Sequence, residues 1–155
     1  MTTYYHGSHS PIEPGTVMTG RGVRYESQWT DADFFWALEI HRPEGCLAHR
    51  DAVFMVDNVE DIDNAGGCTD FCLEVMPEEP VSRHDLNWST EISCLISDGH
   101  APRSEAVREA ALNYWKGLPH PEREPVWECL ARKVTVLKCE ALDADPGLAG
   151  VLLNC

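Results

Sequence analysis

Basic residues are scarce in this sequence, because 12 Lys and Arg stand against 26 Asp and Glu and give a formal net charge of −14. A field of that sign repels phosphate backbones, so we do not expect the chain to bind duplex nucleic acid. The charge suits a solvated acidic surface, a basic protein partner, or a surface that imitates nucleic acid.

Long apolar runs are also missing. No stretch of about 20 apolar residues occurs, so the sequence predicts no membrane span. Residues 1–6 lack the basic and apolar regions of a signal peptide. The 7 cysteines are an odd number, and without an export signal we interpret them as reduced thiols. These features predict a cytoplasmic protein with no membrane partner.

The two common phosphate-binding loops are absent, since the sequence contains neither GxGxxG nor GxxxxGK[ST]. There is no internal repeat, low-complexity tract or linker. A chain of 155 residues can bury a core of its own, so we expect one domain over 1–155. Short strands separated by short helices predict an α+β fold.

Apolar periodicity locates the expected elements. It predicts strands over residues 4–8, 51–56, 71–76 and 126–138. The remaining residues 143–155 carry weak signal.

Helices are expected over three segments. One covers residues 31–41 and is capped by Thr30 or Asp31. A short one follows Asn58 and stops at Gly66-Gly67, and the clearest covers 105–116. Ser104 is expected to cap that last helix and Gly117 to end it.

The first motif with chemical potential is Tyr-His-Gly-Ser at residues 5–8. A strand that ends in His-Gly lets an imidazole reach a ligand hydroxyl. The glycine lets backbone N–H and C=O groups approach a planar carboxamide closely. The alternative is a polar strand end with a structurally satisfied histidine.

Two further segments carry candidate groups. Phe54 lies in an apolar strand, where most positions are ordinary core but an aromatic ring can stack on a ligand ring. Residues 81–88 combine Asp85 with an amide, an imidazole and an indole. An Asx-type turn with a packed Trp explains that segment equally simply.

Glu128 interrupts an otherwise apolar strand, Trp-Glu-Cys-Leu at residues 127–130. Burying a carboxylate is costly unless it has a partner or a task. Such a glutamate can accept a hydrogen bond from a ribose hydroxyl and stabilise positive charge beside it. It can equally face solvent, and the spacing leaves both alternatives open.

Taken in chain order, these segments resemble the ADP-ribosyltransferase superfamily, most closely its small bacterial and phage members. Residues 5–8 are similar to the opening Tyr-His-Gly-Thr of the rifamycin-modifying enzymes. Residues 53–55 are similar to their Val-Tyr strand, and Asp85-Leu86-Asn87 to the Asp-Pro-Asn that carries their acid. The resemblance implies a compact α+β fold of short twisted sheets flanked by short helices.

A phage group that ADP-ribosylates CRISPR effectors is also similar. Its members begin with Phe-His-Gly-Ser, carry a central Leu-Asn-Tyr and finish on a Trp-Leu-Cys-Leu strand. Residues 86–88 (Leu-Asn-Trp) and 127–130 (Trp-Glu-Cys-Leu) match the last two. All of these matches are short motifs, spread between residues 4 and 138.

The resemblance implies a role for each matching residue. His6 would hydrogen-bond the adenosine ribose, and the backbone of Gly7 would hold the nicotinamide carboxamide. Phe54 falls where the family usually has a tyrosine that stacks on nicotinamide, so the stacking is kept and a hydroxyl is lost. Tyr5 or Tyr25 would supply a second aromatic wall. The expected cofactor-binding residues are Tyr5, His6, Gly7, Ser8, Tyr25 and Phe54.

The resemblance implies three catalytic residues, His6, Glu128 and Asp85. The catalytic acid among them is either Glu128 or Asp85. Glu128 resembles the glutamate that opens a late strand in the toxin and poly-ADP-ribose branches, and Asp85 matches the rifamycin-modifying branch. We prefer Glu128. The implied activity is NAD⁺-dependent mono-ADP-ribosylation without a metal. Its expected target is a protein, as in the phage inhibitors of host defence.

Three alternatives stay open. The acceptor can be a small molecule such as an antibiotic. The chain can instead be a non-catalytic acidic inhibitor that mimics nucleic acid. Finally, His41, Cys46, His49, Cys68 and Cys72 lie close enough in sequence for a tetrahedral zinc site, although they lack the tight CxxC pairs typical of one.

Overall fold

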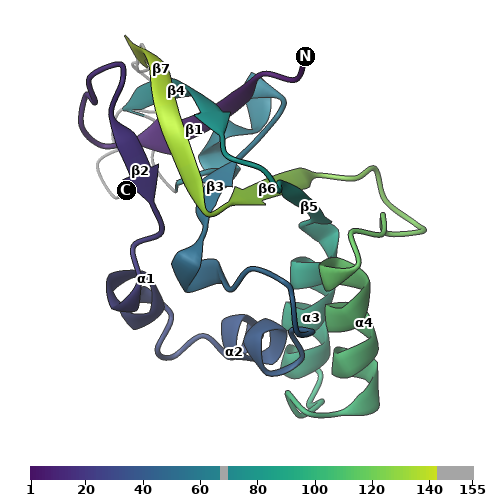
Figure 1. Cartoon of the computed structure of the whole chain (residues 1–155). Helices are drawn as coiled ribbons and strands as arrows, with labels where there is room; N and C mark the ends of the chain where they lie inside the picture. The colour runs from purple at the N-terminus through teal and green to yellow at the C-terminus, as the bar shows by residue number, and fades with distance from the viewer. Residues whose placement is uncertain (67–69, 143–155) are drawn as a thin grey trace, which may run out of the picture.

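In the computed structural model, which describes residues 1–66 and 70–142, two antiparallel sheets lie above a group of short helices (Figure 1). The larger sheet has the order β1-β4-β7-β2, with β1 at Tyr4–Ser8, β4 at Phe71–Pro77, β7 at Lys133–Ala141 and β2 at Val17–Thr19. The smaller has the order β3-β6-β5, with β3 at Val53–Met55, β6 at Trp127–Ala131 and β5 at Ser82–Asp85. The mixed α+β class expected from the sequence is therefore confirmed.

The helices are short. They are α1 (Val23–Gln28), α2 (Asp33–Ile40), α3 (Asn87–Ser97) and α4 (Glu105–Trp115), with 3₁₀ turns η1 (His49–Asp51) and η2 (Val59–Asn64). α3 and α4 pack side by side, and α2 lies against both (Figure 1). Over the ranges that the structure covers, no helix combines the length and the apolar character needed to cross a membrane.

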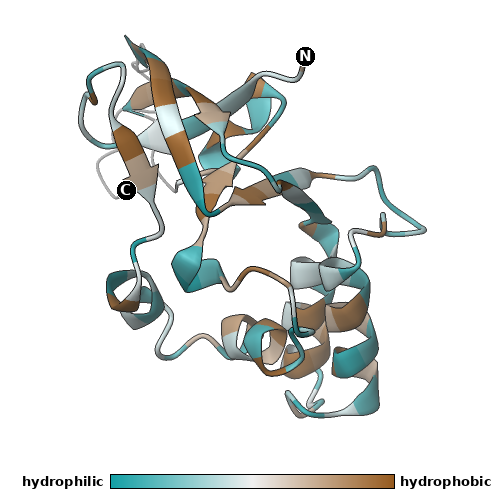
Figure 2. Cartoon of the chain, in the orientation of Figure 1, coloured by the Kyte–Doolittle hydropathy of each residue, from teal (hydrophilic) through white to brown (hydrophobic). Residues whose placement is uncertain are grey.

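The smaller sheet is packed on both faces, and strand alternation decides which side chain goes where. Its Met55 and Cys129 join the apolar cluster shared with the larger sheet. Leu130 and Phe54 point the other way and form a separate cluster. Apolar residues also fill the space between α2, α3 and α4 (Figure 2). Glu128, like Leu130, therefore lies on the face that is turned toward the helices.

The expected strand over 126–138 is wrong in one respect, because it is two strands. The chain bends at Arg132, so that β6 joins the smaller sheet and β7 the larger. The apolar pattern runs on through the bend, because β6 is buried and Val134 and Val136 at the start of β7 are core residues. It therefore gave no sign of the change of sheet.

Other expectations were met in part. The helix expected over 31–41 exists, but Ala32 precedes it and neither Thr30 nor Asp31 caps it. Asn58 does cap η2, accepting a hydrogen bond from the Glu60 N–H. Ser104 occupies the N-cap position of α4 without making a side-chain capping bond.

Five elements among the described residues were not predicted, namely β2, α1, η1, β5 and α3. The segment 81–88 contains the strand β5, which was not expected, and runs into the first residues of α3. The Asx-type turn with a packed Trp is also present, since the Asn87 N–H donates to Asp85 Oδ1 and Trp88 is buried. Gly67 and the segment 143–155 lie outside the described residues.

Gly20 lets the segment between β2 and α1 pass directly over η1. A methyl group at this position would lie 2.6 Å from the Arg50 carbonyl oxygen and 2.7 Å from the Ala52 nitrogen. These are backbone atoms that cannot move aside.

Gly20→Ala should therefore lower the free energy of unfolding in urea by about 2–3 kcal/mol, the typical cost of overpacking. Gly99→Ala is the control, because Gly99 has a φ of +99° and open space around it. It should cost only the left-handed backbone strain of roughly 1 kcal/mol. Equal losses in the two variants would contradict the contact.

Candidate functional site

A cleft opens on the helix-facing side of the smaller sheet. Two adjoining hollows of about 230 and 190 Å³ form it. They share the lining residues Tyr25, Trp29, Phe54, Asn64 and Glu128. These residues come from α1, the segment after it, β3, η2 and β6, so segments far apart in sequence meet here.

Aromatic rings form one wall of the cleft. The rings of Tyr25 and Phe54 stack with centroids 5.1 Å apart and planes at 26°. Because they lie directly on each other, they make a single wall rather than two opposing ones. The Arg21 guanidinium lies 5.7 Å from the centroid of the Tyr25 ring, which places a positive charge at the same wall. Sequence reasoning missed Arg21.

Glu128 is the buried carboxylate of this cleft. Its exposed fraction is 7%, so the solvent-facing alternative is wrong. One of its oxygens, Oε2, accepts a hydrogen bond of 2.7 Å from the hydroxyl of Tyr114. Burial raises the pKa of Glu128 to about 7, although the Tyr114 hydrogen bond acts in the opposite direction. The side chain therefore titrates near neutral pH.

His6 lies behind the cleft, beneath Gly66. Its Nδ1 is 2.7 Å from the Phe54 carbonyl oxygen, so Nδ1 carries the proton and donates it. Burial lowers the pKa of His6, which keeps the imidazole neutral with Nε2 as an acceptor. A methyl group on Gly66 would clash with the Gly7 carbonyl oxygen and lie 2.9 Å from Cε1 of the imidazole, so only glycine lets the chain after η2 close over His6.

The backbone of Gly7 is already engaged. Its N–H donates to the Ala65 carbonyl at 2.6 Å. Since this is the donor that the resemblance assigns to a nicotinamide carboxamide, that contact has to open before the carboxamide can bind there. Gly7 is thus placed close to the cleft but covered by the chain that follows η2.

Tyr5 and Ser8 do not line the cleft. The Tyr5 side chain packs with the core cluster under η2 that contains Val56 and Cys72. The Ser8 hydroxyl donates to the Ser10 carbonyl at 2.8 Å. The expected cofactor-binding set is therefore divided, with Tyr25 and Phe54 in the cleft, His6 and Gly7 behind it, and Tyr5 and Ser8 outside.

Asp85, the other candidate acid, is fully buried and lies outside the cleft. Its Oδ1 accepts from the backbone N–H and the side-chain amide of Asn87 and from the Val126 N–H, at 3.0, 2.9 and 3.1 Å. Its Oδ2 accepts from the His120 N–H at 2.8 Å. The carboxylate thus ties the start of α3 to the segment that leads into β6.

The residues of the zinc alternative have other partners. His41 contacts the Pro102 carbonyl and His49 the Tyr114 hydroxyl, while Cys72 is buried in β4. Cys68 lies outside the described residues. Within residues 1–66 and 70–142, no three His, Cys, Asp or Glu side chains are grouped so that they could hold a metal ion.

We expect Asp85 to contribute to the stability of the fold. Asp85→Asn replaces an acceptor of four hydrogen bonds with an amide that turns a donor toward other donors. We expect a loss of about 2–3 kcal/mol in the free energy of unfolding, measured in urea. Asp57→Asn, at an exposed carboxylate, is the control and should change stability little. An unchanged denaturation midpoint in Asp85→Asn would contradict the structural role.

The raised pKa of Glu128 predicts a pH-dependent stability. The folded state keeps the proton up to about pH 7, whereas the ordinary pKa of a glutamate is 4.5. Stability is therefore full below pH 4.5 and falls as the pH rises through 7, by roughly 3 kcal/mol in total.

Glu128→Gln should remove this loss. The variant should be more stable than the parent at pH 8 and no more stable at pH 4. His49 has a pKa lowered to about 3 by burial and loses stability as the pH falls below 6.5, but it does so in both proteins. The difference between their unfolding curves therefore isolates Glu128. A difference that does not vary with pH would refute the assignment.

Comparison with known proteins gives no match: the chain matches no family model, no curated protein and no solved structure. The family resemblance therefore rests on the motifs of the sequence.

Proposed function

We propose that the chain is an NAD⁺-dependent mono-ADP-ribosyltransferase whose catalytic acid is Glu128. One observation carries the proposal. The cleft brings Tyr25, Phe54 and Glu128 together from three distant segments, and these are residues that the family resemblance assigns to NAD⁺. The two antiparallel sheets with short helices are compatible with the ADP-ribosyltransferase fold, which is part of the same proposal.

The residues in and behind the cleft have different roles in binding NAD⁺. The aromatic wall of Tyr25 and Phe54 stacks on the nicotinamide ring. Arg21 offers a cation to the diphosphate of the dinucleotide. The Nε2 of His6 accepts a hydrogen bond from a ribose hydroxyl once the chain after η2 moves away from Gly7.

Glu128 acts when the glycosidic bond breaks. Nicotinamide leaves with the electron pair of that bond, and positive charge develops on the ribose. A carboxylate fixed by Tyr114 and shielded from water stabilises this charge without reorganising. A nucleophile of the target then attacks the ribose carbon and loses its proton, and water takes its place when no target is present.

A protein is the acceptor we favour, since a net charge of −14 suits a basic partner. Incubation with NAD⁺ and a host lysate, followed by mass spectrometry, would show which species gain ADP-ribose.

The central test is Glu128→Gln. It should lower the rate of nicotinamide release by about 10²–10³-fold, because the charge helps only as the bond breaks. Binding of NAD⁺, measured as a thermal shift in the presence of EDTA, should be retained. In the parent, kcat should rise as the pH increases through about 7, because the ionised form of Glu128 is the active one.

Glu13→Gln removes an exposed carboxylate and is the matched control. It should behave as the parent. A parent that neither binds nor cleaves NAD⁺ would overturn the proposal and favour a non-catalytic acidic inhibitor. A fully active Glu128→Gln would overturn the choice of acid.

A further inference from the structure

A chain of buried polar contacts leads from Glu128 through Tyr114 to His49, which both line the inner hollow of the cleft. The Tyr114 hydroxyl is 2.7 Å from Glu128 Oε2 and also 2.7 Å from His49 Nε2. The other ring nitrogen of His49, Nδ1, lies 3.4 Å from Glu39 Oε1. Tyr114 is fully buried and His49 is 4% exposed, so solvent does not replace these contacts.

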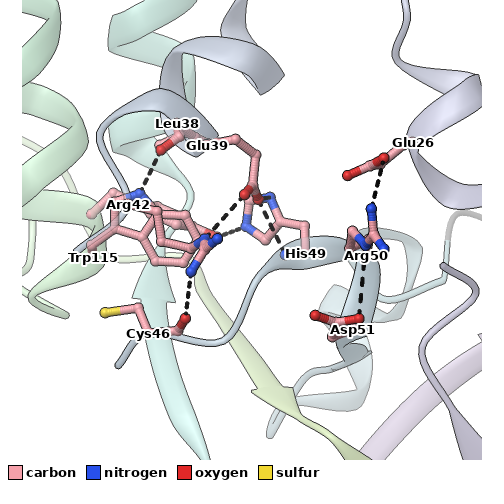
Figure 3. A network of polar contacts seen from close by, with 10 residues as sticks. Glu26, Leu38, Glu39, Arg42, Cys46, His49, Arg50, Asp51 and Trp115 are labelled. Carbon is pink, nitrogen blue, oxygen red and sulfur yellow. Dashed lines mark hydrogen bonds and ion pairs between the residues drawn. The ribbon is translucent and has the colours of Figure 1, made fainter. Parts of the chain in front are cut away.

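The far end of this chain is held rigidly (Figure 3). Arg42 donates through Nε to Glu39 Oε2 at 3.1 Å and through Nη1 to the Cys46 carbonyl at 2.9 Å. Glu39 Oε1 also accepts the backbone N–H of His49 at 3.1 Å. The Glu39 carboxylate is thus fixed as an acceptor that faces the imidazole.

A hydroxyl carries one proton, so the chain has two consistent hydrogen-bond directions. With Glu128 ionised, Tyr114 donates to Glu128 and receives the proton of His49 Nε2. The Nδ1 of His49 is then bare. It has no hydrogen-bond partner among the described residues, and it faces the Glu39 carboxylate.

With Glu128 protonated, every direction reverses. The carboxyl group donates to the Tyr114 oxygen, and the Tyr114 hydroxyl donates to the bare Nε2 of His49. The proton of His49 is then on Nδ1 and points at Glu39. Between the two states the chain gains one proton, and the imidazole stays neutral because burial lowers its pKa to about 3.

We propose that Tyr114 and His49 are positioning residues for Glu128, which fix its carboxylate and couple its charge to the tautomer of His49. The proton balance is complete. On acidification, solvent supplies one proton at the Glu39 end, where the side chain is 14% exposed, and Nδ1 takes it up. Nε2 passes its proton to the Tyr114 oxygen, and Tyr114 passes its own to Glu128. The catalytic part of this inference rests on the proposed function, whereas the coupling itself does not.

Other charged or titratable groups surround the chain without joining it. The Tyr25 hydroxyl approaches Glu128 from α1, and its pKa is raised by burial. From β5, His84 donates through Nδ1 to the Tyr114 backbone carbonyl and is kept neutral by burial, which lowers its pKa. Arg21 lies at the mouth of the cleft and Arg42 beyond Glu39. None of these side chains offers a second partner to the Tyr114 hydroxyl among the contacts found.

The tautomer is directly measurable by ¹⁵N NMR of His49 between pH 5.5 and 8.5, a range of about 1.5 pH units to either side of the Glu128 midpoint near 7. We expect the proton on Nε2 at high pH and on Nδ1 at low pH, with a midpoint of about 7. In Tyr114→Phe the tautomer should no longer follow pH, and the midpoint of the Glu128 carboxyl, followed by its infrared band, should rise. Tyr4→Phe, at a half-buried tyrosine of β1, is the control and should leave both unchanged.

A His49 tautomer that stays the same in the parent over this range would overturn the coupling. So would the same switch in Tyr114→Phe. If Tyr114→Phe does not fold, the NMR titration of His49 in the parent alone still tests the coupling.

Kinetics supply a second readout. In Tyr114→Phe the rise of kcat with pH should move to higher pH, while KM for NAD⁺ stays within about twofold. His49→Gln keeps an N–H near the Tyr114 oxygen, so this variant should retain most of the parent's dependence of kcat on pH. His49→Phe lacks that group and should lose it. A fall in melting temperature with an unchanged pH profile would show a merely structural role. If the parent cleaves no NAD⁺, the proposed function is refuted. The ¹⁵N NMR titration of His49 then still tests whether its tautomer is coupled to the charge of Glu128.

Discussion

The carboxylate of Glu128 is the constraint around which the helix-facing half of the molecule is arranged. A buried charge is tolerated only with partners, and over residues 1–66 and 70–142 this one has a single donor, the hydroxyl of Tyr114. Tyr114 in turn is fixed by α4, which packs against α3, and its hydroxyl meets His49 of η1. Burial is thus only partly compensated, which is why the pKa of Glu128 stays near neutral.

Incomplete compensation has a physical use. A carboxylate satisfied by many donors is strongly stabilised as an anion and gains little when positive charge develops beside it. Asp85 differs from Glu128 in geometry, because its two oxygens accept four hydrogen bonds and it does not line the cleft. Among the described residues, Glu128 has one hydrogen-bond donor, and its side chain lines the cleft, so a ligand bound there would meet its charge. Two buried acids of the same short sheet are therefore suited to different tasks.

Much of this could be anticipated residue by residue. Alternation at Phe71, Leu73 and Val75 predicted β4, and the stop at Gly117 predicted the end of α4. The suspicion attached to Glu128 came from its place in an apolar strand. The elements that escaped prediction are short and polar, such as α1, or had a simpler local explanation, such as β5. Nothing in the local sequence around Tyr114 shows what its hydroxyl contacts.

The sequence by itself determined the α+β class, the positions of the main strands, and a short list of residues with chemical potential. Apolar periodicity and turn residues determine secondary structure locally, so helices and strands can be predicted from them without knowledge of the tertiary structure. Only the tertiary structure decided which of those residues meet. It turned Glu128 inward, stacked Tyr25 on Phe54, enclosed Asp85 in backbone hydrogen bonds and covered Gly7 with Ala65. Each of these outcomes depends on contacts between segments distant in the chain, and local pattern carries no information about such contacts.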